Sequence, residues 1–313
     1  MAQEIKPNWS EADIANQSGK TIFITGANIG LGFEATRMLS AKGARVIMAC
    51  RSEARANDAR RAILAINPKA QLDIVSLDLG DLESASAMPA KLADIGVKKI
   101  DVLINNAGIM MPPKRQVTKQ NFEAQFGTNH LGHFALTRTL FPLLAANGRI
   151  VNVASIADRR GDINWEDIGW EKTYSPAAAY GQSKTANLLF TKGLSERLAA
   201  AGSKIVALAA HPGISQTNLA ANSILKNWLW LVMPLLKMGL GPKTQSAAMG
   251  ALPEVYAATA EVEAGAYYGP SERTRGYPIR AEAHRAAHSD SAEAAQKLWE
   301  ISEVLTGSEF VIK

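Results

Sequence analysis

The sequence has little cysteine and no long uninterrupted apolar run. The single cysteine, Cys50, has no partner for an internal disulfide, which fits a reducing compartment and leads us to expect a cytoplasmic protein. The most apolar window, 223–240, is broken by two lysines, an asparagine and a proline. A membrane-spanning helix needs roughly 20 predominantly apolar residues, so this window is a poor candidate. The polar residues 1–10 also lack the apolar core of a signal peptide.

The sequence also lacks a strong excess of charge of either sign. The chain carries 34 basic and 29 acidic residues, a net charge of +5, without a block of Lys and Arg. We therefore expect no nucleic-acid partner. The 313 residues, of which 47% are hydrophobic, are enough to bury the core of one large α/β domain. His284 and His288 have helical spacing, but no third ligand follows in a metal-binding pattern, so we expect no metal site.

Short β-rich runs alternate with helical patterns along the chain. This alternation predicts a parallel sheet covered by helices on both faces. We expect a polar N-terminal lead-in over 1–18 and a single dinucleotide-binding catalytic domain over 19–313. The expected strands are 21–25, 45–49, 72–76, 101–105, 149–153, 204–210 and 265–268. The expected helices are 31–41, 52–66, 121–145 and 176–201, the last with Ser175 as its N-cap.

The sequence Thr25-Gly-Ala-Asn-Ile-Gly-Leu-Gly32 lies between the first expected strand and helix. Glycines at this place permit a tight turn and a close approach of the backbone to a pyrophosphate, and the helix N-terminus adds free N–H groups. The pattern therefore predicts a bound dinucleotide. Taken alone, it is also compatible with a simple tight turn.

The end of the second strand indicates which dinucleotide is bound. An acidic residue roughly 20 positions past the turn is typical of NAD(H) binding, because it accepts hydrogen bonds from the ribose 2′-hydroxyl. Here the position holds Cys50, followed by Arg51. A guanidinium can bind a 2′-phosphate, so we predict NADP(H) in preference to NAD(H). The alternative is that Arg51 is an ordinary solvated charge at the start of a helix.

Tyr180 and Lys184 lie four residues apart on an expected helix and therefore share a face. A free tyrosine has a pKa near ~10, and a nearby cation can lower it by roughly 1–3 units. We accordingly expect Tyr180 to give a proton to a carbonyl oxygen, or to remove one from an alcohol. Considered as a pair alone, a tyrosine and a lysine at this spacing are more often a packed ring beside a solvated ammonium.

Taken together, the motifs resemble those of the short-chain dehydrogenase/reductase family, in the branch with retinol dehydrogenases and the WW-domain oxidoreductase. The resemblance runs from about Gly19 to Gly307. It implies a Rossmann-type, doubly wound parallel sheet of seven strands in the order 3-2-1-4-5-6-7. The motifs that carry it are Thr25 to Gly32, Ala49-Cys-Arg51, Asp78-Leu79, Asn105-Asn-Ala-Gly108, Asn129-His-Leu-Gly-His-Phe134, Ser155, Tyr180 to Lys184, and His211-Pro-Gly213.

The resemblance also implies roles for individual residues. Tyr180 would act as general acid and base, Lys184 would hold the nicotinamide ribose, Ser155 would polarise the substrate oxygen and Asn129 would hold a water of the proton relay. One departure from the family is Ile29, where many relatives carry a small polar or basic residue. The implied cofactor contacts are Gly26, Asn28, Ile29, Gly30, Leu31, Gly32, Arg51, Asp78, Leu79, Asn105, Ala107, Gly108, Tyr180, Lys184, Pro212, Gly213 and Thr217.

The substrate side is less defined. In the family the region after Thr217 forms a cap, and here about 219–240 is rich in large apolar residues, which favours a hydrophobic substrate. A packed helical pair, a subunit contact or a membrane-surface helix would have the same composition. The segment 156–173, with Trp165 and Trp170, is a candidate for the opposite wall of the pocket.

The sequence therefore predicts an NADP(H)-dependent oxidoreductase that interconverts a carbonyl and an alcohol on a hydrophobic small molecule. Two alternatives remain open: a carbon–carbon double-bond reductase of the same fold, and a non-catalytic NADP(H)-sensing binding protein. The resemblance is also compatible with a homodimer or a homotetramer.

Overall fold

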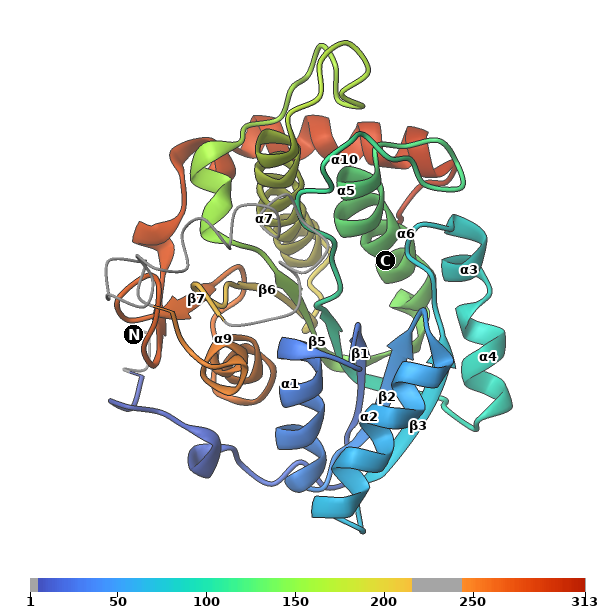
Figure 1. Cartoon of the computed structure of the whole chain (residues 1–313), viewed down its shortest axis with the longest axis vertical. Helices are drawn as coiled ribbons and strands as arrows, with labels where there is room; N and C mark the ends of the chain where they lie inside the picture. The colour runs from blue at the N-terminus through green and yellow to red at the C-terminus, as the bar shows by residue number, and fades with distance from the viewer. Residues whose placement is uncertain (1–4, 216–243, 313) are drawn as a thin grey trace.

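The computed structural model describes residues 5–215 and 244–312, and it contains one eight-stranded sheet in the order β3-β2-β1-β4-β5-β6-β7-β8 (Figure 1). Neighbouring strands pair in parallel up to β7, and β8 pairs antiparallel with β7. The strands are β1 (Thr21–Thr25), β2 (Arg45–Cys50), β3 (Gln71–Ser76), β4 (Ile100–Asn105), β5 (Leu144–Val153), β6 (Val206–Ala210), β7 (Tyr267–Pro270) and β8 (Pro278–Arg280).

Side chains along the central strands alternate between two cores, one on each face of the sheet. In β1, Ile22 and Ile24 pack in one cluster and Phe23 in the other, as the period of two in a strand requires. The first cluster is covered by α1 (Gly30–Ala41), α2 (Glu53–Ile66) and α9 (Ala247–Thr259), and Figure 1 shows α9 beside α1. The second is covered by α4 (Met88–Asp94), α6 (Gly132–Leu140), α7 (Pro176–Ala200) and α10 (Ala292–Thr306).

The expected doubly wound sheet and its strand order are confirmed, with one added strand and shifted strand boundaries. The added strand is β8, whose three residues are too short to show a pattern in the sequence. β5 begins at Leu144, which pairs with Ile100 before a bulge interrupts the register. The expected start of α7 is confirmed. Ser175 is the N-cap and accepts a hydrogen bond from Ala178 N at 3.4 Å, and Pro176 follows at the first helical position.

The long helix expected over 121–145 is shorter and less regular in the structure. Asn121 has φ of 68° and Val117 pairs with Glu123 in an isolated bridge, so the helical conformation starts only at α5 (Ala124–Phe126). A π-helical turn, η2 (Gly127–Leu131), separates α5 from α6, and η3 (Phe141–Leu143) ends the run. Single π turns within helices are frequent at functional sites, and this one carries Asn129.

The N-terminal stretch is polar in composition, but part of it belongs to the core. Trp9 and Ile14 are buried, and the Trp9 ring meets the Tyr256 ring of α9 edge-on at a centroid distance of 5.0 Å. Glu11 accepts two hydrogen bonds of 2.8 Å from the Arg37 guanidinium of α1. The stretch thus supports α1 and α9.

Two expectations about the substrate side concern residues outside the described ranges. Thr217 and the apolar segment 219–240 both fall between the two ranges. The described residues nearest to them are tied together: Ser215 and Gln245 form a parallel bridge, and the Gln245 amide donates to Pro212 O at 2.8 Å. Over 5–215 and 244–312, no helix combines the length and the apolar character that crossing a bilayer requires.

Candidate functional site

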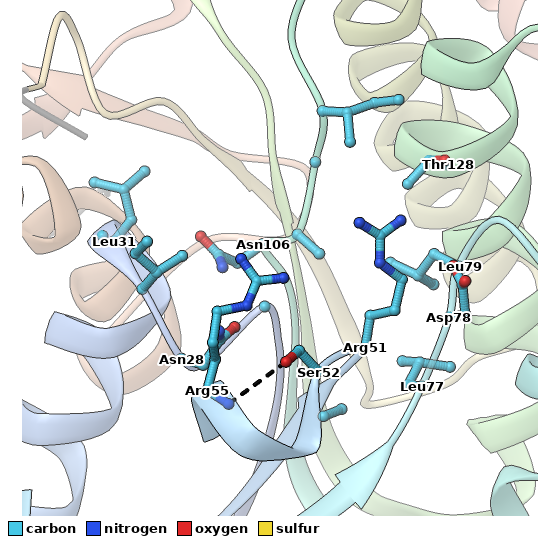
Figure 2. A pocket seen from close by; sticks show the side chains of 17 residues that line it. Asn28, Leu31, Arg51, Ser52, Arg55, Leu77, Asp78, Leu79, Asn106 and Thr128 are labelled. Atoms are coloured by element: carbon cyan, nitrogen blue, oxygen red, sulfur yellow. Dashed lines mark hydrogen bonds between the residues drawn. The ribbon is translucent and has the colours of Figure 1, made fainter. Parts of the chain in front are cut away.

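A cleft opens at the carboxyl ends of β1 to β4, on the sheet edge where open α/β proteins bind ligands (Figure 2). The glycine-rich turn forms one wall, the turn from β2 into α2 the second, and the segments after β3 and β4 the others. The lining residues are Gly26, Asn28, Ile29, Gly30, Leu31, Ala49, Arg51, Ser52, Arg55, Leu77, Asp78, Leu79, Asn106, Ala107, Gly108, Ile109 and Thr128.

The turn before α1 has the geometry expected of a phosphate-binding loop. Gly26 and Gly30 adopt φ of 67° and 58°, which side-chain-bearing residues rarely do. A Cβ on Gly32 would lie 2.5 Å from both Asn106 Nδ2 and Gly26 O, so the close packing of α1 on the turn requires glycine. Ile29 at the N-cap offers no side-chain acceptor to the first turn of α1. The N–H groups of that turn are therefore available to an anion.

Two arginines of the cleft come from the β2–α2 turn. Arg51 and Arg55 are both exposed, and within the described ranges neither forms an ion pair. Figure 2 shows both side chains reaching into the cleft from the same turn, on either side of Ser52. Sequence reasoning missed Arg55, although its position one helical turn after Arg51 was a usable signal.

Most of the residues expected to bind the cofactor line this cleft. Asn105 does not: its side-chain amide donates to Asn152 Oδ1 at 2.8 Å and to Thr137 Oγ1 at 3.0 Å, within the sheet and the helix beside it. Asn106 lines the cleft instead and donates to Thr25 O at 2.7 Å. Also outside the residues that line the cleft are Gly32, Tyr180, Lys184, Pro212 and Gly213. The expected residues that do line the cleft are Gly26, Asn28, Ile29, Gly30, Leu31, Arg51, Asp78, Leu79, Ala107 and Gly108.

A buried hydrogen-bond chain joins the glycine-rich turn to the helix that carries Asn129. His133 Nδ1 lies 2.9 Å from Asn129 O, and since a carbonyl only accepts, Nδ1 bears the proton. His133 Nε2 then accepts from the Thr25 hydroxyl at 2.9 Å. Thr25 Oγ1 in turn accepts from Asn106 N and Ala107 N, both at 2.9 Å. Burial lowers the pKa of His133 to about 4, so the ring is neutral at physiological pH.

Asn129 holds the backbone of Ile109, in the segment that follows β4, through hydrogen bonds of its side chain. Its Oδ1 accepts from Ile109 N at 2.8 Å, and its Nδ2 donates to Ile109 O at 3.0 Å and to Ser183 Oγ at 2.9 Å. A Cβ on Gly108 would come within 3.2 Å of Asn129 Oδ1 and 3.7 Å of Lys184 Nζ. Glycine at 108 therefore leaves the space at the end of the cleft open, next to both side chains.

The remaining expected catalytic residues meet at this same end. The Lys184 ammonium lies 5.7 Å from the Tyr180 ring centroid and donates to Val153 O at 3.0 Å. Ser155, two residues after β5, interacts through its hydroxyl with the Tyr180 phenol. Tyr180 and Lys184 are only 8% and 4% exposed. The fold thus brings Asn129, Ser155, Tyr180 and Lys184 to one place.

The expectation that Lys184 lowers the pKa of Tyr180 is wrong for the protein in this state. Burial raises the pKa of Tyr180 to about 12, and the interaction with Ser155 only partly opposes this. Burial also lowers the pKa of Lys184 to about 8. Desolvation is the largest cause for Tyr180, and the Lys184 ammonium, which lies over the ring and bonds to Val153 O, is not among the groups that lower the pKa of Tyr180. The phenol is therefore fully protonated at neutral pH and can act as a proton donor.

The other candidate groups have structural roles. Gly213 N donates to His211 Nδ1 at 3.2 Å, so His211 Nε2 carries the proton and donates to His284 Nδ1 at 3.1 Å. His211 thereby orients the loop that begins at Pro212. Trp165 packs under the Lys297 ammonium of α10, 4.5 Å from its ring, and so lies against an outer helix. No group of metal-ligating side chains occurs over 5–215 and 244–312.

Known proteins resemble this chain in sequence and in fold. The sequence profile of the family described as short chain dehydrogenase matches residues 20–228. Retinol dehydrogenase 12 of Mus musculus is 38% identical over 295 residues, which cover 92% of this chain and 87% of the relative. Retinol dehydrogenase 14 of Homo sapiens is 38% identical over 307 residues with the same coverage. The crystal structure of an uncharacterised protein from Mycobacterium paratuberculosis is 41% identical and superposes with a TM-score of 0.80, covering 97% of this chain and 100% of that one.

Proposed function

The chain belongs to the short-chain dehydrogenase family of oxidoreductases, and on that premise we propose that it is an NADP(H)-dependent enzyme that interconverts a carbonyl and an alcohol. The observation that carries the proposal is the convergence of Ser155, Tyr180 and Lys184 beside Gly108, where the cleft ends. A proton donor, a second hydroxyl and an ammonium at one place are the groups that carbonyl reduction requires from a protein.

The residues of the cleft fit a phosphorylated dinucleotide. The uncapped first turn of α1 and the two glycines with positive φ suit the pyrophosphate. Arg51 and Arg55 offer two guanidinium groups that form no ion pair among the described residues, and the end of β2 holds Cys50 in place of an acidic residue that would repel a 2′-phosphate. These features support NADP(H) over NAD(H).

The chain's own residues then manage the proton. A bound nicotinamide would supply or accept the hydride. In reduction, Tyr180 gives its phenolic proton to the carbonyl oxygen, and the raised pKa of Tyr180, about 12, keeps that proton in place until it is needed. Ser155 donates a hydrogen bond to the same oxygen, and Lys184 stabilises the phenolate that remains. Asn129 holds Ile109 and thereby fixes the wall beside Gly108.

For the substrate, we propose an apolar aldehyde, ketone or alcohol. Two relatives that match most of the chain are named for retinol, a long apolar alcohol. The sequence of 219–240 is also rich in large apolar residues. Both observations favour a substrate with a hydrophobic body.

The test is a spectrophotometric screen of NADPH and NADH oxidation against apolar aldehydes, aromatic ketones and quinones, with retinal among them. We expect turnover of apolar carbonyl compounds, with a lower KM for NADPH than for NADH. A clear preference for NADH would contradict the cofactor assignment. NADPH binding without oxidation by any member of the panel would contradict the enzymatic proposal and favour a nucleotide-sensing protein. A saturated product from a conjugated carbonyl would instead indicate double-bond reduction.

A further inference from the structure

Gln125 is a fully buried amide whose hydrogen bonds join separate segments of the chain. It lies within α5, and none of its surface is exposed. Its Oε1 accepts from Met111 N at 2.7 Å, and its Nε2 donates to Pro176 O at 3.1 Å and to the Tyr174 hydroxyl at 3.2 Å. The Tyr174 hydroxyl donates in turn to Pro112 O at 3.2 Å. Because a backbone N–H only donates and a carbonyl only accepts, these partners fix the orientation of the amide.

Gln125 and Asn129 hold two points of residues 109–112, a stretch after β4 that we call the wall segment. Asn129 binds both backbone polar groups of Ile109, and Gln125 accepts from Met111 N. Met111 has φ of 48°, a conformation that residues with a side chain rarely adopt and that persists where the surroundings hold it. The Gln125 amide is therefore a contact that keeps Met111 in this conformation.

The wall segment runs alongside the part of α7 that carries Tyr180, and Figure 1 shows the chain after β4 passing between α7 and α5. At one end of the segment, Asn129 also donates to Ser183 Oγ at 2.9 Å. At the other end, Gln125 also donates to Pro176 O, at the start of α7. The stretch of α7 between these contacts spans about 10 Å and includes Tyr180. The wall segment thus flanks the turn that presents the proposed proton donor.

The wall segment places apolar side chains at the reaction end. Ile109, Met110 and Met111 are half-buried, and Ile109 also lines the cleft. The segment carries no charged residue. Methionine side chains are unbranched and adapt to irregular apolar shapes. A carbonyl compound that receives a proton from Tyr180 therefore meets an apolar flank, which favours a hydrophobic body next to the reacting group.

From this arrangement we propose that Gln125 is a positioning residue of the reaction end, which acts through the wall segment and so sets where the apolar body of the substrate lies. The inference deepens the proposed function and rests on it for the presence of a carbonyl substrate. The anchoring of the wall segment by Gln125 does not depend on any reaction. The anchoring and its effect on the substrate can therefore be tested separately.

The first experiment measures the anchoring by hydrogen exchange of backbone amides, followed by mass spectrometry of peptides that contain Met111. Gln125→Leu removes all three hydrogen bonds of the amide and keeps an apolar side chain of similar size. Exchange of the Met111 amide should then accelerate by roughly 3–10-fold, the effect of one lost hydrogen bond. Gln125→Glu keeps an acceptor for Met111 N and should restore most of the protection.

Gln182 is the matched control. It is also a fully buried amide, but its Oε1 accepts from Asn164 N at 3.0 Å and its Nε2 donates to Ile168 O at 2.9 Å. Gln182→Leu should accelerate exchange at Asn164 and leave the Met111 amide at the wild-type rate. If Gln125→Leu leaves the Met111 amide protected, or if Gln182→Leu accelerates its exchange equally, the proposal is overturned.

The second experiment connects the wall segment to the substrate. NADPH oxidation is measured with straight-chain aldehydes from propanal to decanal. In the wild type, kcat/KM should rise with chain length, by up to about fourfold for each methylene that reaches an apolar surface. In Gln125→Leu this rise should flatten, chiefly through a higher KM for the long aldehydes, and Gln125→Glu should restore it. The Kd for NADPH and the kinetics with propanal should stay near the wild-type values, because neither involves the wall segment.

Tyr174→Phe provides a second variant, which spares the core if Gln125→Leu does not fold. It removes the half-buried hydroxyl that links Gln125 to Pro112 O, and it should flatten the dependence on chain length by less. An equal loss at every chain length would indicate a purely structural role and overturn the positioning role, and so would a wild-type dependence in both variants. If no carbonyl compound oxidises NADPH, the proposed function and the substrate role fail together, whereas hydrogen exchange still decides the anchoring.

Discussion

The ionisable side chains at the two ends of the cleft differ in their exposure to solvent. At the nucleotide end, Arg51 and Arg55 are exposed and form no ion pair within the described chain. At the reaction end, Tyr180 and Lys184 are buried and their pKa values are displaced from the ordinary range. An exposed cation costs little to leave unpaired and is screened by salt, whereas a buried group responds to pH. The nucleotide end should therefore be sensitive to ionic strength and the reaction end to protonation.

The largest effect is expected from Tyr180→Phe, which removes one hydroxyl from the buried end. Positioned acid–base catalysis contributes roughly 10²–10⁴-fold, so kcat should fall by about that factor. The Kd for NADPH, measured by quenching of protein fluorescence, should stay near the wild-type value, because the nucleotide end is untouched. Wild-type turnover in the variant would remove Tyr180 from the mechanism.

The second effect concerns the hydrogen-bond chain between the two ends. Burial lowers the pKa of His133 to about 4, so the folded state resists a proton that the unfolded chain takes up near pH 6.5. This contribution to stability is complete above about pH 6.5 and is lost as the pH falls toward 4, at about 1.4 kcal/mol per pH unit. His133→Gln, which does not titrate, should remove that slope from the urea-unfolding free energy.

Buried carboxyls with raised pKa values have the opposite effect, because they stabilise the fold as the pH falls. The quantity to compare is therefore the difference in unfolding free energy between the variant and the wild type at each pH. Burial also lowers the pKa of His130 and of His211 to about 3, and these two contributions are present in both proteins. An acid slope in His133→Gln equal to that of the wild type would mean that other groups cause it.

The third effect belongs to the exposed end. Replacing Arg51 and Arg55 together by alanine removes two charge-assisted contacts to a 2′-phosphate, each worth about 1.5–3 kcal/mol at most. The KM for NADPH should rise by about 10–100-fold, the KM for NADH should change little, and the salt dependence of NADPH binding should weaken. Arg61→Ala, on an exposed part of α2 paired with Asp58, should change none of these. An equal loss for both nucleotides would contradict the assignment.

The smallest expected effect is a change in stability when the N-terminus of α1, at the glycine-rich turn, receives a capping side chain. Ile29 stands at the N-cap of α1, is 43% exposed and offers no acceptor. Ile29→Ser should stabilise the nucleotide-free protein by about 1 kcal/mol, seen as a higher Tm, because serine caps the first turn. Ile66→Ser, at another exposed isoleucine, should give no such gain. A Tm for Ile29→Ser that does not exceed that of Ile66→Ser would show that the first turn gains nothing from a cap.

Much of the fold and the location of both ends of the cleft could be predicted from the sequence alone. Strand and helix periodicity gives the doubly wound sheet, and the glycine-rich turn and the Tyr180–Lys184 spacing mark the two ends of the cleft. These patterns are local, and local patterns are readable in a sequence. The two guanidinium groups are an intermediate case, since Arg55 was detectable from its helical spacing to Arg51 but was missed.

The rest depends on contacts between distant segments. The raised pKa of Tyr180 follows from burial by several elements, which the sequence does not quantify. The exclusion of Asn105 from the cleft arises from its side-chain hydrogen bonds to Thr137 and Asn152, and no sequence pattern announces the π turn at Asn129. Packing decides each of these features.

The contact between Trp9 and Tyr256 has a consequence for how the protein can be trimmed. A chain cut back to residue 19 would keep every motif of the nucleotide fold and would lose the indole that shields one flank of α9. That same helix presses Gly250 toward Leu31. Proteolytic nicking near residue 15 should therefore loosen cofactor retention at a distance, although the removed peptide contributes no residue to the cleft.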